Sequence, residues 1–146
     1  MTDGSNNPYY VPRSDREQTE MTRKHIFIIN GSPEFLDLIR QLLQDERYNV
    51  TSTDFVPRTF DQIAALQPDL LLLDLVIQRE AGWTLLERLR AEALTRGIPV
   101  IVTSTDFRLL EQAEREQAQY AGNTYLIIPF DLDDLLRAVT GLIGAA

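Results

Sequence analysis

A run of four leucines at residues 70–73, followed by Asp74, constrains the fold more than any other segment of the 146-residue chain. Because leucine occupies every position, a strand built from this run has no polar face and must be covered on both sides. Such strands are typical of parallel sheets, in which the connecting helices pack on the two faces. The run therefore predicts an α/β protein in which short apolar strands alternate with amphipathic helices.

The remainder of the chain shows this alternation. Each strand-like segment is followed by one in which apolar residues recur at the three- and four-residue spacing of a helix. Strands are predicted at residues 25–29, 48–53, 70–73, 99–103 and 125–128, and helices at 33–43, 60–64, 83–93, 107–120 and 132–143. Five strand–helix pairs favour one doubly wound parallel sheet with helices on both faces.

Local signals define the ends of two helices. Ser32 is a good N-cap for the first helix, and Pro33 suits its first helical position. Gly97 is predicted to end the helix at 83–93. The apolar stripe of the first helix is predicted to contain Phe35, Leu38, Ile39, Leu42 and Leu43.

Composition excludes several classes of function. The net charge is −8, the chain has no cysteine, and Lys24 and His25 are the only lysine and histidine. An acidic chain is unsuited to nucleic-acid phosphates, and without cysteine there is no thiolate metal site. Lys24 follows no glycine-rich phosphate loop, and no internal histidine can complete a Ser–His–Asp triad. We therefore expect a protein that is not an enzyme and does not bind nucleic acid.

The chain divides into an arm and one domain. Residues 1–23 are polar, contain Pro8 and Pro12, and lack an apolar period, so they are predicted to be a flexible arm. Residues 24–146 carry the alternating pattern and form the predicted domain. No apolar run reaches the roughly 20 residues that span a bilayer, and the N-terminus has no apolar leader. We expect a cytoplasmic protein without a membrane partner.

In a doubly wound sheet, the functional site lies beyond the carboxyl ends of the strands, where the strand order reverses. The sequence places six residues at those ends, and they are the candidates for the site: Asn30, Gly31, Asp74, Ser104, Thr105 and Ile128.

Several motifs in this order resemble the receiver domain of two-component response regulators. The segment PDLLLLDLVIQREAGW at 68–83 resembles its third strand, where Asp74 occupies the phospho-acceptor position and Gly82 follows eight residues later. IPVIVTSTD at 98–106 resembles the fourth strand and places Ser104 at a phosphoryl-contacting switch position. YLIIPF at 125–130 resembles the closing segment and places Tyr125 at the aromatic switch position. The resemblance covers roughly residues 25–144 and implies strand order 2-1-3-4-5 and a cis peptide bond before Pro129.

The site departs from the family pattern at three positions. Asn30 and Gly31 stand where the family has two acidic residues, and Ile128 stands where it has a lysine. In the family, the acidic pair and the acceptor aspartate hold Mg²⁺, a hard ion that prefers carboxylate oxygens. Asp74 is then the only anionic metal ligand expected here, so no cofactor is expected, or at most weakly bound Mg²⁺. Replacement of the missing acids by Glu34, Asp37 or Glu80 is the less favoured alternative.

The leading hypothesis is a stand-alone, degenerate receiver in a bacterial-type phosphorelay. It would act by contacts with a histidine kinase, a phosphotransfer protein or a downstream effector, with little metal-dependent phosphorylation, and could form a homodimer. One alternative is an ordinary phospho-acceptor at Asp74 with a rebuilt metal site. Another, from a different class, is a small-ligand-binding domain that uses the crevice at the carboxyl ends of the strands, which Gly31 and Ile128 make less charged.

Overall fold

The computed structural model describes residues 23–54, 57–120 and 122–146. Its elements follow the predicted alternation. They are β1 (His25–Ile29), α2 (Pro33–Asp45), β2 (Asn49–Thr53), α3 (Thr59–Leu66), β3 (Leu70–Asp74), α4 (Ala81–Ala91), β4 (Val100–Ser104), α5 (Phe107–Glu116), β5 (Asn123–Ile127) and α6 (Leu132–Ile143). The five strands form one parallel sheet in the order β2-β1-β3-β4-β5, which confirms the predicted fold.

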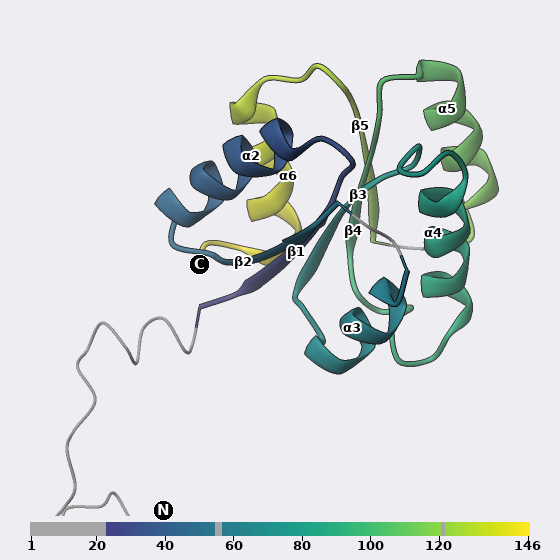
Figure 1. Ribbon diagram of the computed structural model, residues 1–146, viewed down its shortest axis with the longest axis horizontal. Coiled ribbons are helices and arrows are strands. Elements are labelled where there is room, and N and C mark those ends of the chain that lie inside the picture. The colour runs from purple at the N-terminus through teal and green to yellow at the C-terminus, as the bar shows by residue number, and fades with distance from the viewer. Residues whose placement is uncertain (1–22, 55–56, 121) are drawn as a thin grey trace, which may run out of the picture.

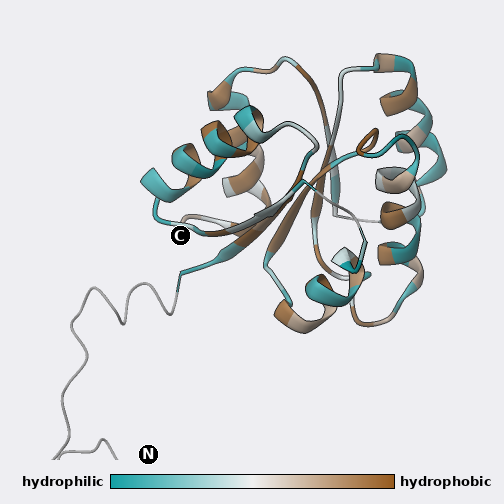
Figure 2. Cartoon of the chain, viewed as in Figure 1, coloured by the Kyte–Doolittle hydropathy of each residue, from teal (hydrophilic) through white to brown (hydrophobic). Residues whose placement is uncertain are grey.

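The helices form two layers on the sheet (Figure 1). Helices α2 and α6 cover one face, and α3, α4 and α5 cover the other. Figure 2 shows hydrophobic residues along the central strands and hydrophilic residues over much of the outer helix surfaces. The protein therefore has two apolar cores, one on each side of the sheet.

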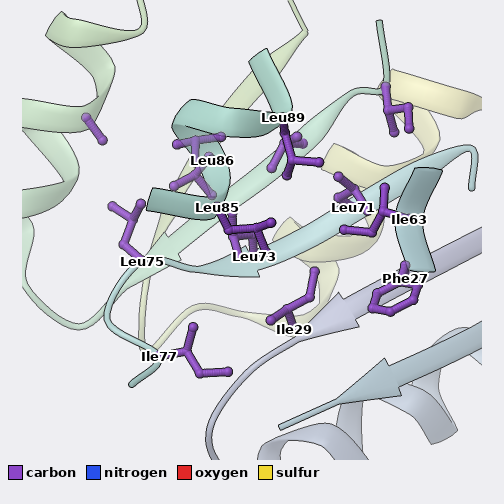
Figure 3. Packing of buried hydrophobic residues seen from close by; sticks show 14 of the residues in the cluster. Phe27, Ile29, Ile63, Leu71, Leu73, Leu75, Ile77, Leu85, Leu86 and Leu89 are labelled. Carbon is purple, nitrogen blue, oxygen red and sulfur yellow. The ribbon is translucent and has the colours of Figure 1, made fainter. Parts of the chain in front are cut away.

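The leucine run of β3 contributes to both cores. Leu71 and Leu73 pack on the side of α3, α4 and α5, and Leu70 and Leu72 pack on the side of α2 and α6. All four are at most 2% exposed. Figure 3 shows Leu71 and Leu73 among side chains from α3, α4 and β1. The prediction that this strand is covered on both faces is confirmed.

The start of α2 also follows the sequence. Ser32 is the N-cap, its Oγ accepts a hydrogen bond from the Phe35 amide, and Pro33 is the first helical residue. The predicted apolar stripe was partly wrong, because Leu38 is 55% exposed and Leu36 is buried instead. Two stripes that share Ile39 and Leu43 were possible in the sequence, and packing on the sheet selected the one that contains Leu36.

The ends of two other helices differ from the prediction. Helix α4 ends at Ala91, so Gly97 does not terminate it and lies in the following loop. The Thr95 hydroxyl donates to the Leu89 carbonyl and holds this loop against the helix. Helix α5 ends at Glu116, earlier than predicted, and turns follow it.

The Ile128–Pro129 peptide bond is cis, as the resemblance implied. The predicted arm at residues 1–23 lies outside the described residues except for Arg23. Among the residues described, no helix combines the length and the apolar character needed to cross a membrane.

Candidate functional site

The carboxyl ends of β1 and β3, together with the segments after β4 and β5, surround a cleft of about 380 Å³. Parallel strands end at the same edge of the sheet, which brings these segments together. Five of the six predicted site residues line the cleft: Asn30, Gly31, Asp74, Thr105 and Ile128. The sixth, Ser104, is fully buried beneath it.

Asp74 is the last residue of β3 and is half-buried. Its Oδ1 accepts a hydrogen bond from the Val76 amide at 3.2 Å, and no cation pairs with it within the described part of the chain. Burial raises the pKa of Asp74 above its usual value, and the hydrogen bond from Val76 opposes that shift. The carboxylate at the acceptor position therefore lacks the neighbouring positive charge that would stabilise its ionised form.

Asn30 and Gly31 form the turn between β1 and α2. Asn30 is 5% exposed, and its Oδ1 accepts a hydrogen bond from the Ser32 amide at 2.8 Å. The Asn30 side chain therefore serves the turn that begins α2. Gly31 has an ordinary backbone conformation, and a Cβ atom there would meet only Ile77 Cγ1, at 3.7 Å. The backbone of this turn would accept side chains at both positions.

The last residue of β4, Ser104, and the residue that follows it, Thr105, are both hydroxyl residues with different surroundings. Ser104 Oγ accepts a hydrogen bond from the Asp106 amide at 2.9 Å, so it holds the loop that leads into α5. Thr105 is exposed and lines the cleft. The switch role predicted for Ser104 stays a prediction, and of these two residues it is Thr105 that lines the cleft.

Apolar side chains form a wall of the cleft. Ile128 lines it together with Phe35 and Ile77. The Ile128 amide donates to the Ser104 carbonyl at 2.8 Å, which fixes the backbone at the position where the family has a lysine. The sequence reasoning did not single out Phe35 and Ile77 as site residues. The apolar pair Val76–Ile77 in a loop that follows a buried strand was the available signal.

Tyr125 lies on β5, away from the lining of the cleft. Its ring is partly buried against the core formed with α3, α4 and α5, and its hydroxyl accepts a hydrogen bond from Asn123 Nδ2 at 3.1 Å. Burial raises the pKa of Tyr125. Its role as a switch stays a prediction.

The acidic residues considered as replacement metal ligands do not gather around Asp74. Glu34 accepts a hydrogen bond from Ser32 Oγ at 3.2 Å, Asp37 lies 4.0 Å from Arg40 Nη1, and Glu80 lines a different groove. Within residues 23–54, 57–120 and 122–146, no three His, Asp or Glu side chains form a group that could hold a metal ion. Among the oxygen ligands that the cleft could offer a metal ion are the Asp74 carboxylate and the side-chain carbonyl oxygen of Asn30.

The fold is a doubly wound parallel sheet, and a carboxylate, Asp74, stands at the end of its central strand beside the cleft. The family model of the response regulator receiver domain matches residues 26–140. The chain belongs to this family and is a receiver domain of two-component signalling.

Two curated proteins are similar to this chain in sequence. The DNA-binding dual master transcriptional regulator RpaA of Synechocystis is 29% identical over 118 residues, which cover 81% of this chain and 48% of that protein. The chain thus spans about half the length of this relative. An uncharacterized 14.6 kDa protein of Leptolyngbya boryana is 27% identical over 120 residues and is covered over 89% of its length.

Solved receiver domains share the fold. The BeF₃-activated receiver domain of Klebsiella pneumoniae RstA superposes with a TM-score of 0.71 at 23% identity, covering 82% of this chain and 98% of that one. The receiver domain of the Pseudomonas aeruginosa sensor histidine kinase PA1611 superposes with a TM-score of 0.71 at 23% identity, covering 84% of this chain and 98% of that one. That structure has a magnesium ion coordinated in its active-site cleft.

Proposed function

We propose that this receiver acts as a protein-binding module of a phosphorelay, with little Mg²⁺-dependent phosphorylation of Asp74. One observation carries the proposal: Asp74 is the only carboxylate among the residues that line its cleft, and Ile128 stands at the lysine position. We further propose that the receiver unit comprises residues 24–146 and works without nucleic-acid or membrane partners. Self-association of this unit into a homodimer is part of the same proposal.

The charge balance of the cleft supports weak metal binding. Mg²⁺ keeps several waters and is held in proteins by one or two carboxylates, which supply most of the compensating charge. One charge pair at about 4 Å contributes on the order of 4 kcal/mol at an effective dielectric of 20. With Asn30 and Gly31 in place of two acids, the cleft lacks two such contributions. Phosphoryl transfer depends on charge neutralisation, so its rate should fall by orders of magnitude.

Ile128 affects the phosphorylated state as well. A phosphoryl group on Asp74 would add negative charge to a cleft whose adjoining wall is Phe35, Ile77 and Ile128. No cationic side chain lines this cleft within the described part of the chain, so the added charge would have no counterion. Without a stabilised phosphorylated state, the receiver would keep one dominant conformation. The partners that we propose would recognise the surface of that conformation, and they are a histidine kinase, a phosphotransfer protein or an effector.

The test compares the native cleft with a rebuilt one. Wild type, Asp74→Asn and the double variant Asn30→Asp/Gly31→Asp are titrated with Mg²⁺ and then with beryllofluoride while amide NMR spectra are recorded. Aspartate at position 30 keeps an oxygen for the Ser32 amide, and position 31 has room for a side chain. We expect the double variant to respond at Asp74 and Thr105 at Mg²⁺ concentrations that leave wild type unchanged.

Two outcomes would favour the other functions. A wild-type response at Asp74, Ser104 and Tyr125 that Asp74→Asn abolishes would show a rebuilt metal site and a working phospho-acceptor. A response to neutral metabolites but not to Mg²⁺ would favour small-ligand binding, for which the apolar wall of Phe35, Ile77 and Ile128 is suited.

A further inference from the structure

A second groove lies between α4 and α5, on the other side of the loop that follows Asp74. Its volume is about 380 Å³, within the range of protein ligand sites. Both helices pack on the same face of the sheet (Figure 1). Its apolar lining consists of Leu75, Trp83 and Leu109. Neither the receiver site at Asp74 nor the function proposed above uses this groove.

The groove carries an excess of negative charge. Glu80 is the N-cap of α4, and Trp83, Thr84 and Glu87 follow it within the helix. They lie three, four and seven residues after Glu80, so all four share one side of the helix. Helix α5 contributes Glu116, and Arg79 is the only basic residue among the lining residues. Three carboxylates thus face one guanidinium.

Two of these carboxylates are available to a ligand. The side chains of Glu80 and Glu87 are exposed and form no hydrogen bond or ion pair with any residue that the structure describes. Glu116 accepts a hydrogen bond from Gln112 Nε2 at 2.8 Å, which aligns it along the groove. Trp83 is partly buried against the core and lines the same groove as Glu80 and Glu87.

We propose that this groove binds a basic segment of a partner protein, with a lysine or arginine side chain against Trp83 and an apolar side chain on Leu109. A cation near an indole ring is attracted by the π-system, and tryptophan is the strongest of the aromatic side chains in this respect. The flanking carboxylates add charge complementarity, which an acidic or neutral segment would not satisfy. The apolar floor favours a peptide over a bare inorganic cation.

The groove borders the Asp74 loop. Leu75 lines the groove, and the residue before it, Asp74, lines the other cleft. A Cβ atom on Gly82 would lie 2.2 Å from the Asp74 carbonyl oxygen, so the first turn of α4 rests directly on this backbone. A partner that presses the first turn of α4 toward β3 would therefore push against the backbone of Asp74.

Trp83 provides the readout, because it is the only tryptophan of the chain. The full chain is titrated with an amidated peptide of about three helical turns that carries leucine and arginine on one face. The control peptide has citrulline in place of arginine, which keeps the shape and removes the charge. Trp83 emission and the NMR signal of its indole N–H are recorded. We expect a saturable response to the arginine peptide and a several-fold weaker one to the citrulline peptide.

A matched pair of variants locates the site. Glu80→Gln/Glu87→Gln removes two charges from the groove, and Glu111→Gln/Glu114→Gln removes two from the exposed surface of α5 outside it. We expect the first to weaken arginine-peptide binding by about threefold to tenfold and the second by less than about twofold. Amide spectra confirm that both variants fold, and Asp74→Asn should still bind the peptide, which separates this test from that of the proposed function.

Three results would overturn the proposal. They are the absence of a Trp83 response, equal weakening by the two double variants, and equal binding of the arginine and citrulline peptides. A Trp83 response to protein concentration alone would also overturn it, in favour of a second copy of this chain in the groove.

Discussion

Gly82→Ala tests the close contact that joins α4 to the end of β3. A Cβ atom at position 82 would lie 2.2 Å from the Asp74 carbonyl oxygen and 2.7 Å from the Leu75 carbonyl oxygen. Both neighbours are backbone atoms of a buried strand end, so they cannot rotate away as a side chain could. The first turn of α4 must instead move away from β3 by roughly 1 Å, because unstrained contacts of this kind exceed about 3 Å.

Two opposing contributions set the change in the free energy of unfolding caused by Gly82→Ala. Overpacking against backbone reduces the free energy of unfolding by about 3 kcal/mol or more. The preference of a helix for alanine over glycine raises the free energy of unfolding by at most about 1 kcal/mol. We expect a net loss of about 2 kcal/mol, measured by urea unfolding followed by circular dichroism, with an unchanged slope m.

Gly141→Ala is the matched control. Gly141 lies within α6, and a Cβ atom there would meet nothing within 4 Å. Only the helix preference remains, so the free energy of unfolding should rise by up to about 1 kcal/mol. If Gly82→Ala were as stable as wild type, or shifted in the same direction as Gly141→Ala, the close contact with Asp74 would not exist as described. The spacing of Gly82 from Asp74 would then have lost its structural explanation.

Three further predictions concern stability. Because burial raises the pKa of Asp74, ionisation of this carboxyl opposes folding. The resulting loss of unfolding free energy grows as pH rises from about 3.8 and is complete above the raised pKa. Asp74→Asn should therefore stabilise the protein at pH 7 but not below pH 4, as measured by urea unfolding at each pH. Arg90→Met should lower the free energy of unfolding by about 3 kcal/mol or more, because it removes the donor that Arg96 and Ile98 carbonyls share in a buried site; a loss below about 1 kcal/mol would contradict this. Ser32→Ala should cost about 1 kcal/mol through loss of the α2 cap, while Ser32→Asp should retain most of the stability; equal thermal unfolding of all three proteins would refute the cap.

The fold could be read from the sequence because its signals are local and repeated. The apolar runs at 70–73 and 26–29, the cap at Ser32 and the spacing of apolar residues in the helices each depend on neighbours within a few positions. A parallel sheet with helices on both faces is the arrangement that buries such runs. The candidate site residues at the strand ends were proposed from the same pattern together with the resemblance to receiver domains.

The details that failed depend on packing between distant segments. Leu36 and Leu38 are equally apolar, and only the orientation of α2 on the sheet decides which one is buried. Gly97 was an acceptable helix end in sequence terms, but α4 ends at Ala91, and the Thr95 hydroxyl holds the following loop against the Leu89 carbonyl. Such choices depend on side chains far apart along the chain, which no local pattern contains.

The burial of Arg90 also depends on segments that are far apart along the chain. Arg90 is a charged residue of α4, yet it is 1% exposed and donates to carbonyls of the loop before β4 and to Asn123 Oδ1 on β5. An arginine is buried only where acceptors from several segments converge on it. That convergence exists only once the chain has folded.

At the site, the sequence alone determined which chemical groups are present: one aspartate, an asparagine and a glycine in place of acids, and an isoleucine in place of lysine. Only the tertiary structure decided how they are used. It directs the Asn30 side chain to the Ser32 amide and Ser104 to the Asp106 amide, and it places Ile128 in the wall of the cleft that Asp74 lines. Residue types are local properties of the chain, whereas hydrogen-bond partners and burial depend on strand ends that the parallel sheet brings together from four separate segments.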